Sequence, residues 1–290
     1  RPPWIALTLA FSFGFYGLVK KQVNLEGAQS LAVETAFLTA PALALVVWFV
    51  VGGDGAFPRE GIDHALLMIG EGYFRQAEYE PAAEAYRVAR ERIEKQNETQ
   101  QQFTSVADRQ IRELVFLHGG QSLVQLKEYE AAKGWFEELE QRFPESQYLP
   151  QARYETAFAL QQSGQDDEAL KLYEQVAAEQ RNELGARSRF MMGEIYFGRR
   201  DLAKAIPEFQ RVMYGYGAER APEAVRNWQA KSGYEAGRCA ELMIEQASTP
   251  YRRQKSTEIA MQFFQYVVDK HPKHELAAMG QERLEALKRQ

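Results

Sequence analysis

The feature that most constrains the fold of this sequence is a small residue followed, twelve positions later, by an alanine. An aromatic and then an aliphatic residue follow each alanine at helical spacing. The four copies are Gly70 and Ala82, Gly120 and Ala132, Ala157 and Ala169, and Gly193 and Ala205. Two helices approach closely only where side chains are small, so each copy predicts an antiparallel pair joined by a short turn. One pair buries too little apolar area alone, which predicts an all-α solenoid of stacked pairs.

The repeat departs from this spacing in two places. Ala82 and Ala132 are 50 residues apart, which predicts longer helices or an inserted loop around Asn97–Val106. A fifth unit begins at Ala236-Gly237, but its second helix comes about eleven residues late, and we expect an insertion at Ser248–Lys255. The last helix, over 275–287, is charged on its outer side and is expected to cap the solenoid.

The first 57 residues obey a different pattern. They hold six charged residues whose charges cancel, and the runs 4–19 and 35–53 contain none. Such runs predict a hairpin of two transmembrane helices. The loop between them carries Lys20 and Lys21, so the positive-inside rule places it in the cytoplasm and the C-terminal part outside, in the periplasm. Glu34, near the start of the second run, either faces a transport path or pairs with a loop lysine at the interface.

The strings IALTLAFSFGFYGLVKKQ and LAVETAFLTAPALALVVW resemble an internal stretch of the RarD-type permeases of the drug/metabolite transporter (EamA-like) superfamily. That family builds its pathway from about ten spans, and this segment matches two. The resemblance therefore implies common ancestry for residues 1–57 and not transport. We expect two domains, a transmembrane hairpin over 1–57 and a helical solenoid over 58–290. The alternative is a permease fragment, either joined naturally to the solenoid or joined to it by an error in the gene model.

The helical unit resembles the tetratricopeptide repeat over about residues 60–290, as five helix pairs and a cap. The segments QRFPESQYLPQA and DKHPKHELAAMGQERL resemble bacterial envelope proteins of this class, such as the Tol–Pal coordinator and outer-membrane assembly lipoproteins. The resemblance implies a groove, lined by the first helix of each pair, that holds a peptide or partner helix. The side chains at −6, −3, +1 and +4 from the small residue would face it. These are His64, Leu67, Glu71, Phe74, Leu114, Leu117, Gln121, Val124, Gln151, Tyr154, Phe158, Gln161, Arg187, Phe190, Glu194 and Phe197.

Two interpretations of the groove aromatics stay open, because each ring either contacts a ligand or packs between units. The set lacks the Lys and Asn pattern with which chaperone-binding repeats clamp a terminal carboxylate.

Other functions find little support in the sequence. The net charge of −5 and the absence of a basic stripe argue against nucleic-acid binding. There is no phosphate loop, nucleophile elbow or zinc-protease helix, and the single cysteine, Cys239, has no neighbouring base. We therefore expect a non-enzymatic interaction scaffold at a membrane, with a protein or peptide partner and with no metal or cofactor. The oligomeric state is left open.

Overall fold

The computed structural model describes residues 56–98, 106–217 and 220–289, which contain helices and turns and no strand. The chain divides into two compact units, Arg1–Ala65 and Leu66–Gln290, and the description below concerns the second. The helices are α3 (Ala56–Arg75), α4 (Tyr79–Glu98), α5 (Val106–Gln125), α6 (Tyr129–Arg142), α7 (Leu149–Gln162), α8 (Asp166–Glu179), α9 (Glu183–Gly198), α10 (Leu202–Tyr214), α11 (Glu223–Glu245), α12 (Pro250–Lys270) and α13 (Glu275–Lys288). The predicted all-α fold is confirmed for these residues.

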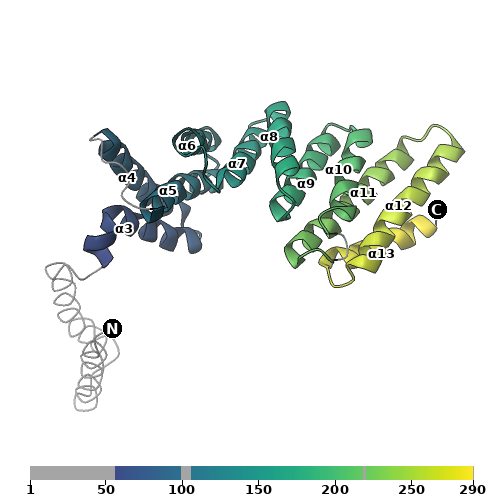
Figure 1. Ribbon diagram of the computed structural model, residues 1–290. Helices are drawn as coiled ribbons and strands as arrows, with labels where there is room; N and C mark the ends of the chain where they lie inside the picture. Colours follow the sequence, from purple (N-terminus) through teal and green to yellow (C-terminus); the bar gives the residue numbers. More distant parts are fainter. Residues whose placement is uncertain (1–55, 99–105, 218–219, 290) are drawn as a thin grey trace, which may run out of the picture. The chain divides into compact units, whose positions relative to one another are not determined.

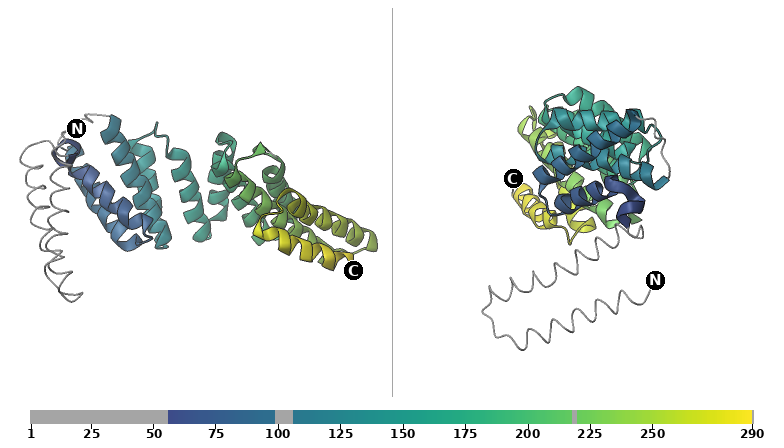
Figure 2. Two further views of the ribbon diagram at one scale, coloured as in Figure 1. Left: turned by 90° about the horizontal axis from the view of Figure 1, so that it is seen from below. Right: turned by 90° about the vertical axis from the view of Figure 1, so that its left-hand side faces the viewer.

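From α4 onward, each helix packs against the next one along the chain (Figure 1). The first helices of neighbouring pairs also contact one another directly, since α7 meets both α5 and α9, and α9 meets α11. The first helices therefore form one continuous layer, whose outer surface we call the first-helix face. Figure 2 shows the same succession of helices from two further directions.

In the pairs whose small residue is glycine, the aromatic ring of the second helix lies on the small residue of the first helix. This contact explains the constant twelve-residue spacing between the small residue and the alanine. A Cβ atom added to Gly70, Gly120 or Gly193 would lie 2.5 Å from a ring carbon of the aromatic on the second helix, which is Tyr86, Phe136 or Phe209. The alanines twelve positions after these glycines are fully buried. The aromatic ring of the second helix therefore fills the space inside its own pair.

The turns between paired helices share one geometry. Ala77, Lys127, Gly164 and Arg200 occupy equivalent positions and have φ angles of 59°, 63°, 78° and 60°. In the turn at Arg200, the backbone N–H of Arg200 donates to Phe197 O (2.9 Å) and that of Asp201 donates to Tyr196 O (2.9 Å). Paired bonds of this kind around a left-handed residue form a Schellman-type helix ending. The left-handed residue reverses the chain so that the second helix packs back on the first.

The fifth unit gains its extra residues mainly in its helices. A Cβ added to Gly237 would lie 2.5 Å from a ring carbon of Phe264, so these two residues correspond to Gly193 and Phe209. α11 and α12 have 23 and 21 residues, against 16 and 13 in the preceding pair. The hydroxyl of Thr249 caps α12 by accepting from Arg252 N (3.2 Å). Most of the expected insertion at Ser248–Lys255 is therefore the first turns of α12.

The structure also bears on the wide spacing between Ala82 and Ala132 and on the expected last helix. α4 and α5 have 20 residues each, while α6 and α7 have 14, so longer helices account for part of the wide spacing there. Residues 99–105 lie outside the described part. The expected last helix is α13, which packs on α12.

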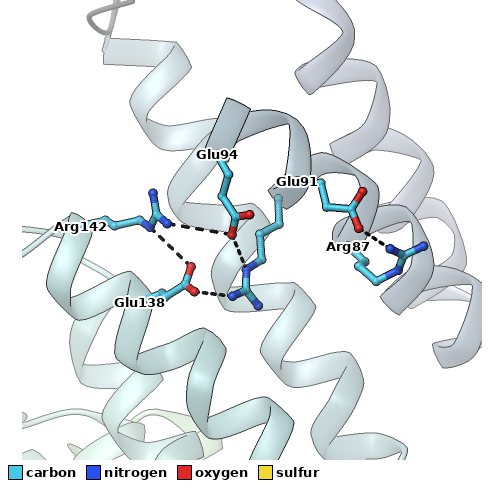
Figure 3. A network of polar contacts seen from close by, with 6 residues as sticks. Arg87, Glu91, Glu94, Glu138 and Arg142 are labelled. Atoms are coloured by element: carbon cyan, nitrogen blue, oxygen red, sulfur yellow. Dashed lines mark hydrogen bonds and ion pairs between the residues drawn. The ribbon is translucent and has the colours of Figure 1, made fainter. Parts of the chain in front are cut away.

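Ion pairs link the second helices of the first two pairs (Figure 3). The guanidinium of Arg90 on α4 pairs closely with Glu138 on α6 and lies 4.8 Å from the ring centroid of Trp135. Arg142 on α6 pairs with Glu138 (3.4 Å) and reaches Glu94 on α4 (4.0 Å). These charged side chains are 24–38% exposed, so solvent still weakens each pair, and we assign this network to the alignment of the two helices.

The predicted transmembrane hairpin and Glu34 lie outside the described residues. No helix in the described part of the chain is both long and apolar enough to cross a membrane. The domain boundary at residue 57 stays a prediction.

Candidate peptide-binding face

Four of the predicted groove residues belong to the core. Leu67, Leu117 and Tyr154 each lie at the −3 position of their pair and are 5%, 4% and 0% exposed. Val124, at a +4 position, is 5% exposed. The ring of Tyr154 lies 5.4 Å from that of Tyr173, the aromatic that packs on its own pair's small residue. In the first three pairs the side chain at the −3 position therefore enters the interior between helices, whereas Phe190, at −3 in the fourth pair, stays partly exposed. The packing interpretation holds for the four buried residues.

The other described members of the predicted set are partly exposed on the first-helix face. They are Glu71, Phe74, Leu114, Gln121, Gln151, Phe158, Gln161, Arg187, Phe190, Glu194 and Phe197. The side chain of His64 lies outside the described part. Among their helices, α5, α7 and α9 form one layer, and Glu71 on α3 contacts His118 on α5, so the structure brings these residues onto a common face.

A polar contact joins the first two pairs across this face. Glu71 on α3 accepts a hydrogen bond from the Tyr86 hydroxyl (2.8 Å) and makes a close contact with Nδ1 of His118 on α5. Burial alone would raise the pKa of Glu71, but the hydrogen bond and charge of His118 outweigh it and hold that pKa below 4.5. Phe74 lies against His118, with ring centroids 5.8 Å apart and nearly parallel planes.

The same kind of contact joins the second and third pairs. Nε2 of Gln121 on α5 donates to Oε1 of Glu155 on α7 (3.0 Å), and Nε2 of Gln151 donates to the same oxygen (2.7 Å). Glu155 is 9% exposed, so these two amides supply the donors that a buried carboxylate requires. In both cases the residue just after one small residue meets the residue two before the next.

A cluster of aromatic and cationic side chains occupies the face between α7 and α11. The guanidinium of Arg187 lies 4.4 Å from the ring centroid of Tyr154 and 5.7 Å from that of Trp228. Trp228 also lies 5.2 Å from the ring of Phe190 and 4.6 Å from the ammonium of Lys231. Nε of Arg187 is buried and has no hydrogen-bond partner in the described part of the chain.

A second charged cluster joins α9 and α11. Burial, and then the charge of Glu235, raise the pKa of Glu194 to about 7, although Arg238 opposes this rise. Oε1 of Glu194 is buried without a hydrogen-bond partner among the described residues. Arg238 donates to Glu235 (2.7 Å) and lies 5.0 Å from the ring centroid of Phe197. Burial also raises the pKa of Cys239 to about 12, so its thiol is not a nucleophile at neutral pH.

Sequence reasoning did not find His118, Glu155, Trp228 or Glu235 on this face. Three of them are two positions before a small residue, a row that becomes visible only when neighbouring pairs are stacked. The predicted groove residues also came only from the first four pairs, although Gly237 could have served as the small reference residue of the fifth. The same offsets from Gly237 give Lys231, Tyr234, Arg238 and Glu241, and Tyr234 is buried like Leu67, Leu117 and Tyr154.

The described residues offer no metal centre, since no group of three or more His, Cys, Asp or Glu side chains is placed to hold one. His271 is buried beside Tyr266, with ring centroids 5.4 Å apart. His274 accepts from Leu276 N (3.2 Å) at the start of α13 and contacts Asn227 Oδ1 (2.8 Å). Both of these histidines therefore have structural roles.

Comparison with known proteins supports both resemblances seen in the sequence. A family model described as tetratricopeptide repeat matches residues 151–182, which hold most of α7 and all of α8. Among solved structures, the chain is similar to the MamA protein, with a TM-score of 0.50, 14% identity, and coverage of 73% of this chain and 92% of MamA. Residues 151–182 therefore match a tetratricopeptide repeat, and the described part of the chain is an all-α solenoid similar in fold to MamA.

Matches to curated proteins concern a much shorter stretch. The chain is 53% identical over 72 residues to protein RarD of Streptomyces exfoliatus, which is 25% of this chain and 23% of that protein. It is 43% identical over 70 residues to an uncharacterized transporter of Pseudomonas aeruginosa, or 24% of each. The chain thus spans about a quarter of the length of the curated relatives it matches. It contains a segment homologous to RarD.

Proposed function

We propose that the chain is a non-enzymatic scaffold whose first-helix face binds an extended peptide or a helix of a protein partner. The observation that carries this proposal is a pair of unsatisfied polar atoms on one helix of that face. Arg187 Nε and Glu194 Oε1, both on α9, are buried and have no hydrogen-bond partner in the described residues. Such groups are costly to leave unpaired, and a peptide backbone offers both a donor and an acceptor.

The residues around these atoms suit a peptide. Phe158, Phe190, Phe197 and Trp228 are each partly exposed and supply apolar contact area. Aromatic and arginine side chains dominate the binding energy of many protein interfaces. The amides of Gln121 and Gln161 can exchange their present partners for those of a peptide.

Site-specific photocrosslinking tests this assignment. A photoreactive phenylalanine analogue at position 158 or 197 should crosslink to a partner in cells, whereas one at Val88, exposed on α4, should not. Equal crosslinking from all three positions, or from Val88 alone, would contradict the assignment to the first-helix face.

We further propose that residues 1–57 hold the scaffold at a membrane, with the solenoid on the extracytoplasmic side. The RarD homology and the two uncharged runs support the tether, and the two loop lysines support the orientation. A tether raises the effective concentration of the solenoid near membrane partners. The alternative, a piece of a drug/metabolite permease, requires further spans, because two cannot enclose a pathway. Glu34 would have a role in transport only under that alternative.

A further inference from the structure

A cavity of about 630 Å³ lies away from the first-helix residues discussed above, where the start of α9 meets the end of α10. Three arginines contribute to its wall, Arg181 from the turn before α9, Arg189 from α9 and Arg211 from α10. Gln210, Tyr214 and Tyr216 supply the other polar side chains of the wall. This concentration of guanidinium groups is unusual in a chain whose net charge is −5.

Glu208 on α10 is buried, and its carboxylate bonds to two of these arginines. It accepts from Arg189 (2.9 Å) and makes a close ion pair with Arg211. One carboxylate shared by two guanidiniums leaves an excess of positive charge once Arg181 is counted. A neighbouring cavity of about 420 Å³ shares Tyr214 with the first.

Arg181 distinguishes a ligand site from a purely structural ion pair. Arg211 lies in the last turn of α10, where a cation complements the helix dipole, and Arg189 joins α9 to Glu208. Arg181 lies in the turn between the end of α8 and the start of α9, and it makes no ion pair with a carboxylate in the described part of the chain. A bound anion would give this guanidinium a partner.

Tyr216 adds a hydrogen-bond donor at the same place. Its hydroxyl is buried close to the guanidinium of Arg189, and it donates to no group in the described part of the chain. The backbone of Tyr216 has a φ of 53°, a conformation that is strained for an aromatic residue. Its ring lies close to Gly185 in the first turn of α9, where an added Cβ would be 3.1 Å from Cε1. The ring is therefore held against the positive end of α9.

We propose that this cavity binds a phosphate group, which is either free or carried on a side chain of a protein partner. Planar guanidiniums bind phosphate oxygens through paired hydrogen bonds, and a phosphate dianion matches the excess charge better than one carboxylate does. The Gln210 amide and the Tyr216 hydroxyl can donate to the remaining oxygens. This site does not depend on the peptide-binding role of the first-helix face.

Isothermal titration calorimetry on the full chain tests the proposal. The probes are inorganic phosphate and a phosphoserine hexapeptide, with its serine twin and chloride at equal ionic strength as controls. We expect saturable binding of at least one phosphate probe with a Kd below about 10 mM. Comparable affinity for both would indicate a site for free phosphate, and tighter binding of the phosphopeptide would indicate a phosphorylated partner.

Matched variants connect the binding to this cavity. Arg181→Ala with Arg211→Ala should weaken binding at least about tenfold, and Tyr216→Phe should weaken it less, with unchanged circular dichroism spectra. Arg252→Ala with Arg253→Ala removes the same charge from exposed residues of α12 and should leave binding intact. Saturable binding of neither probe, an unchanged Arg181/Arg211 variant, or an equal loss in the Arg252/Arg253 variant would overturn the proposal.

Discussion

Gly193 of α9 lies directly against the ring of Phe209 on α10, with no room for a methyl group between them. A Cβ at Gly193 would be 2.5 Å from Cε1 of Phe209, and that ring is fully buried. Gly198, in the last turn of the same helix, has no atom within 4 Å of the position its Cβ would take. These two glycines therefore allow the close approach to be tested within one helix.

We predict that Gly193→Ala lowers the free energy of unfolding by about 1–3 kcal/mol, because the ring and the helix must move apart. Gly198→Ala should be neutral or stabilising by up to about 1 kcal/mol, because alanine favours the helix. Urea unfolding followed by circular dichroism measures both effects. A Gly193→Ala protein as stable as wild type would show that the small residue is not needed for helix pairing.

A second prediction concerns the left-handed turn residues. Lys127 and Arg200 are exposed, and each pays for a positive φ that glycine adopts freely. Lys127→Gly and Arg200→Gly should each raise the free energy of unfolding by about 0.5–1 kcal/mol. Gly164→Ala, at the equivalent turn, should lower it by about 1 kcal/mol. The urea midpoints of the three variants check the signs, and a destabilised Arg200→Gly protein would contradict this explanation.

The sequence was sufficient to predict the helix pairs and the turns between them, because the small residue and the alanine act within one unit. The first-helix face was predictable only in part. Tyr154 and Leu117 fit the groove offsets, yet they are buried, because in their pairs the −3 position points between helices. Glu155 and His118 were missed because their partners, Gln121 and Glu71, belong to the preceding unit. Which residues meet across units depends on how the pairs stack, and periodicity within one unit does not specify this.

The third prediction is that the free energy of unfolding depends on pH because Glu194 titrates. The folded state raises the pKa of this carboxyl from 4.5 to about 7, chiefly by burial and then by the charge of Glu235. The stabilisation from the protonated form is therefore complete below about pH 4.5 and is lost as the pH rises through about 7. Glu194→Gln should remove this part of the decline, since glutamine does not titrate.

Urea midpoints between about pH 4.5 and pH 8 measure this effect. Glu174→Gln, at an exposed position on α8, is the control and should follow the wild-type curve. If Glu194→Gln also follows that curve, the carboxyl does not titrate in this range in the folded protein.

The fourth prediction tests the membrane tether. The full chain should sediment with membranes and resist extraction with alkaline carbonate, because two apolar spans would be embedded in lipid. A chain that starts at Pro58 should remain in the supernatant. Two reporters fused at the C-terminus test the orientation. One that is active only outside the cytoplasm should show activity, and one that is active only inside it should not. Release of the full chain by carbonate would contradict the tether, and a transcript that does not run across Phe57-Pro58 would remove its basis.

The central claim, that the first-helix face binds a protein partner, is tested most directly by a quantitative pull-down from the source cells. The variant carries Phe158→Ala and Phe197→Ala, and the matched control carries Val88→Ala and Tyr251→Ala, which alter exposed side chains on α4 and α12. Both must retain wild-type circular dichroism spectra. We predict that the Phe158/Phe197 variant loses at least about 90% of the captured partner, as expected for the loss of two aromatic anchors, while the control retains it. Equal capture by both variants would contradict the account.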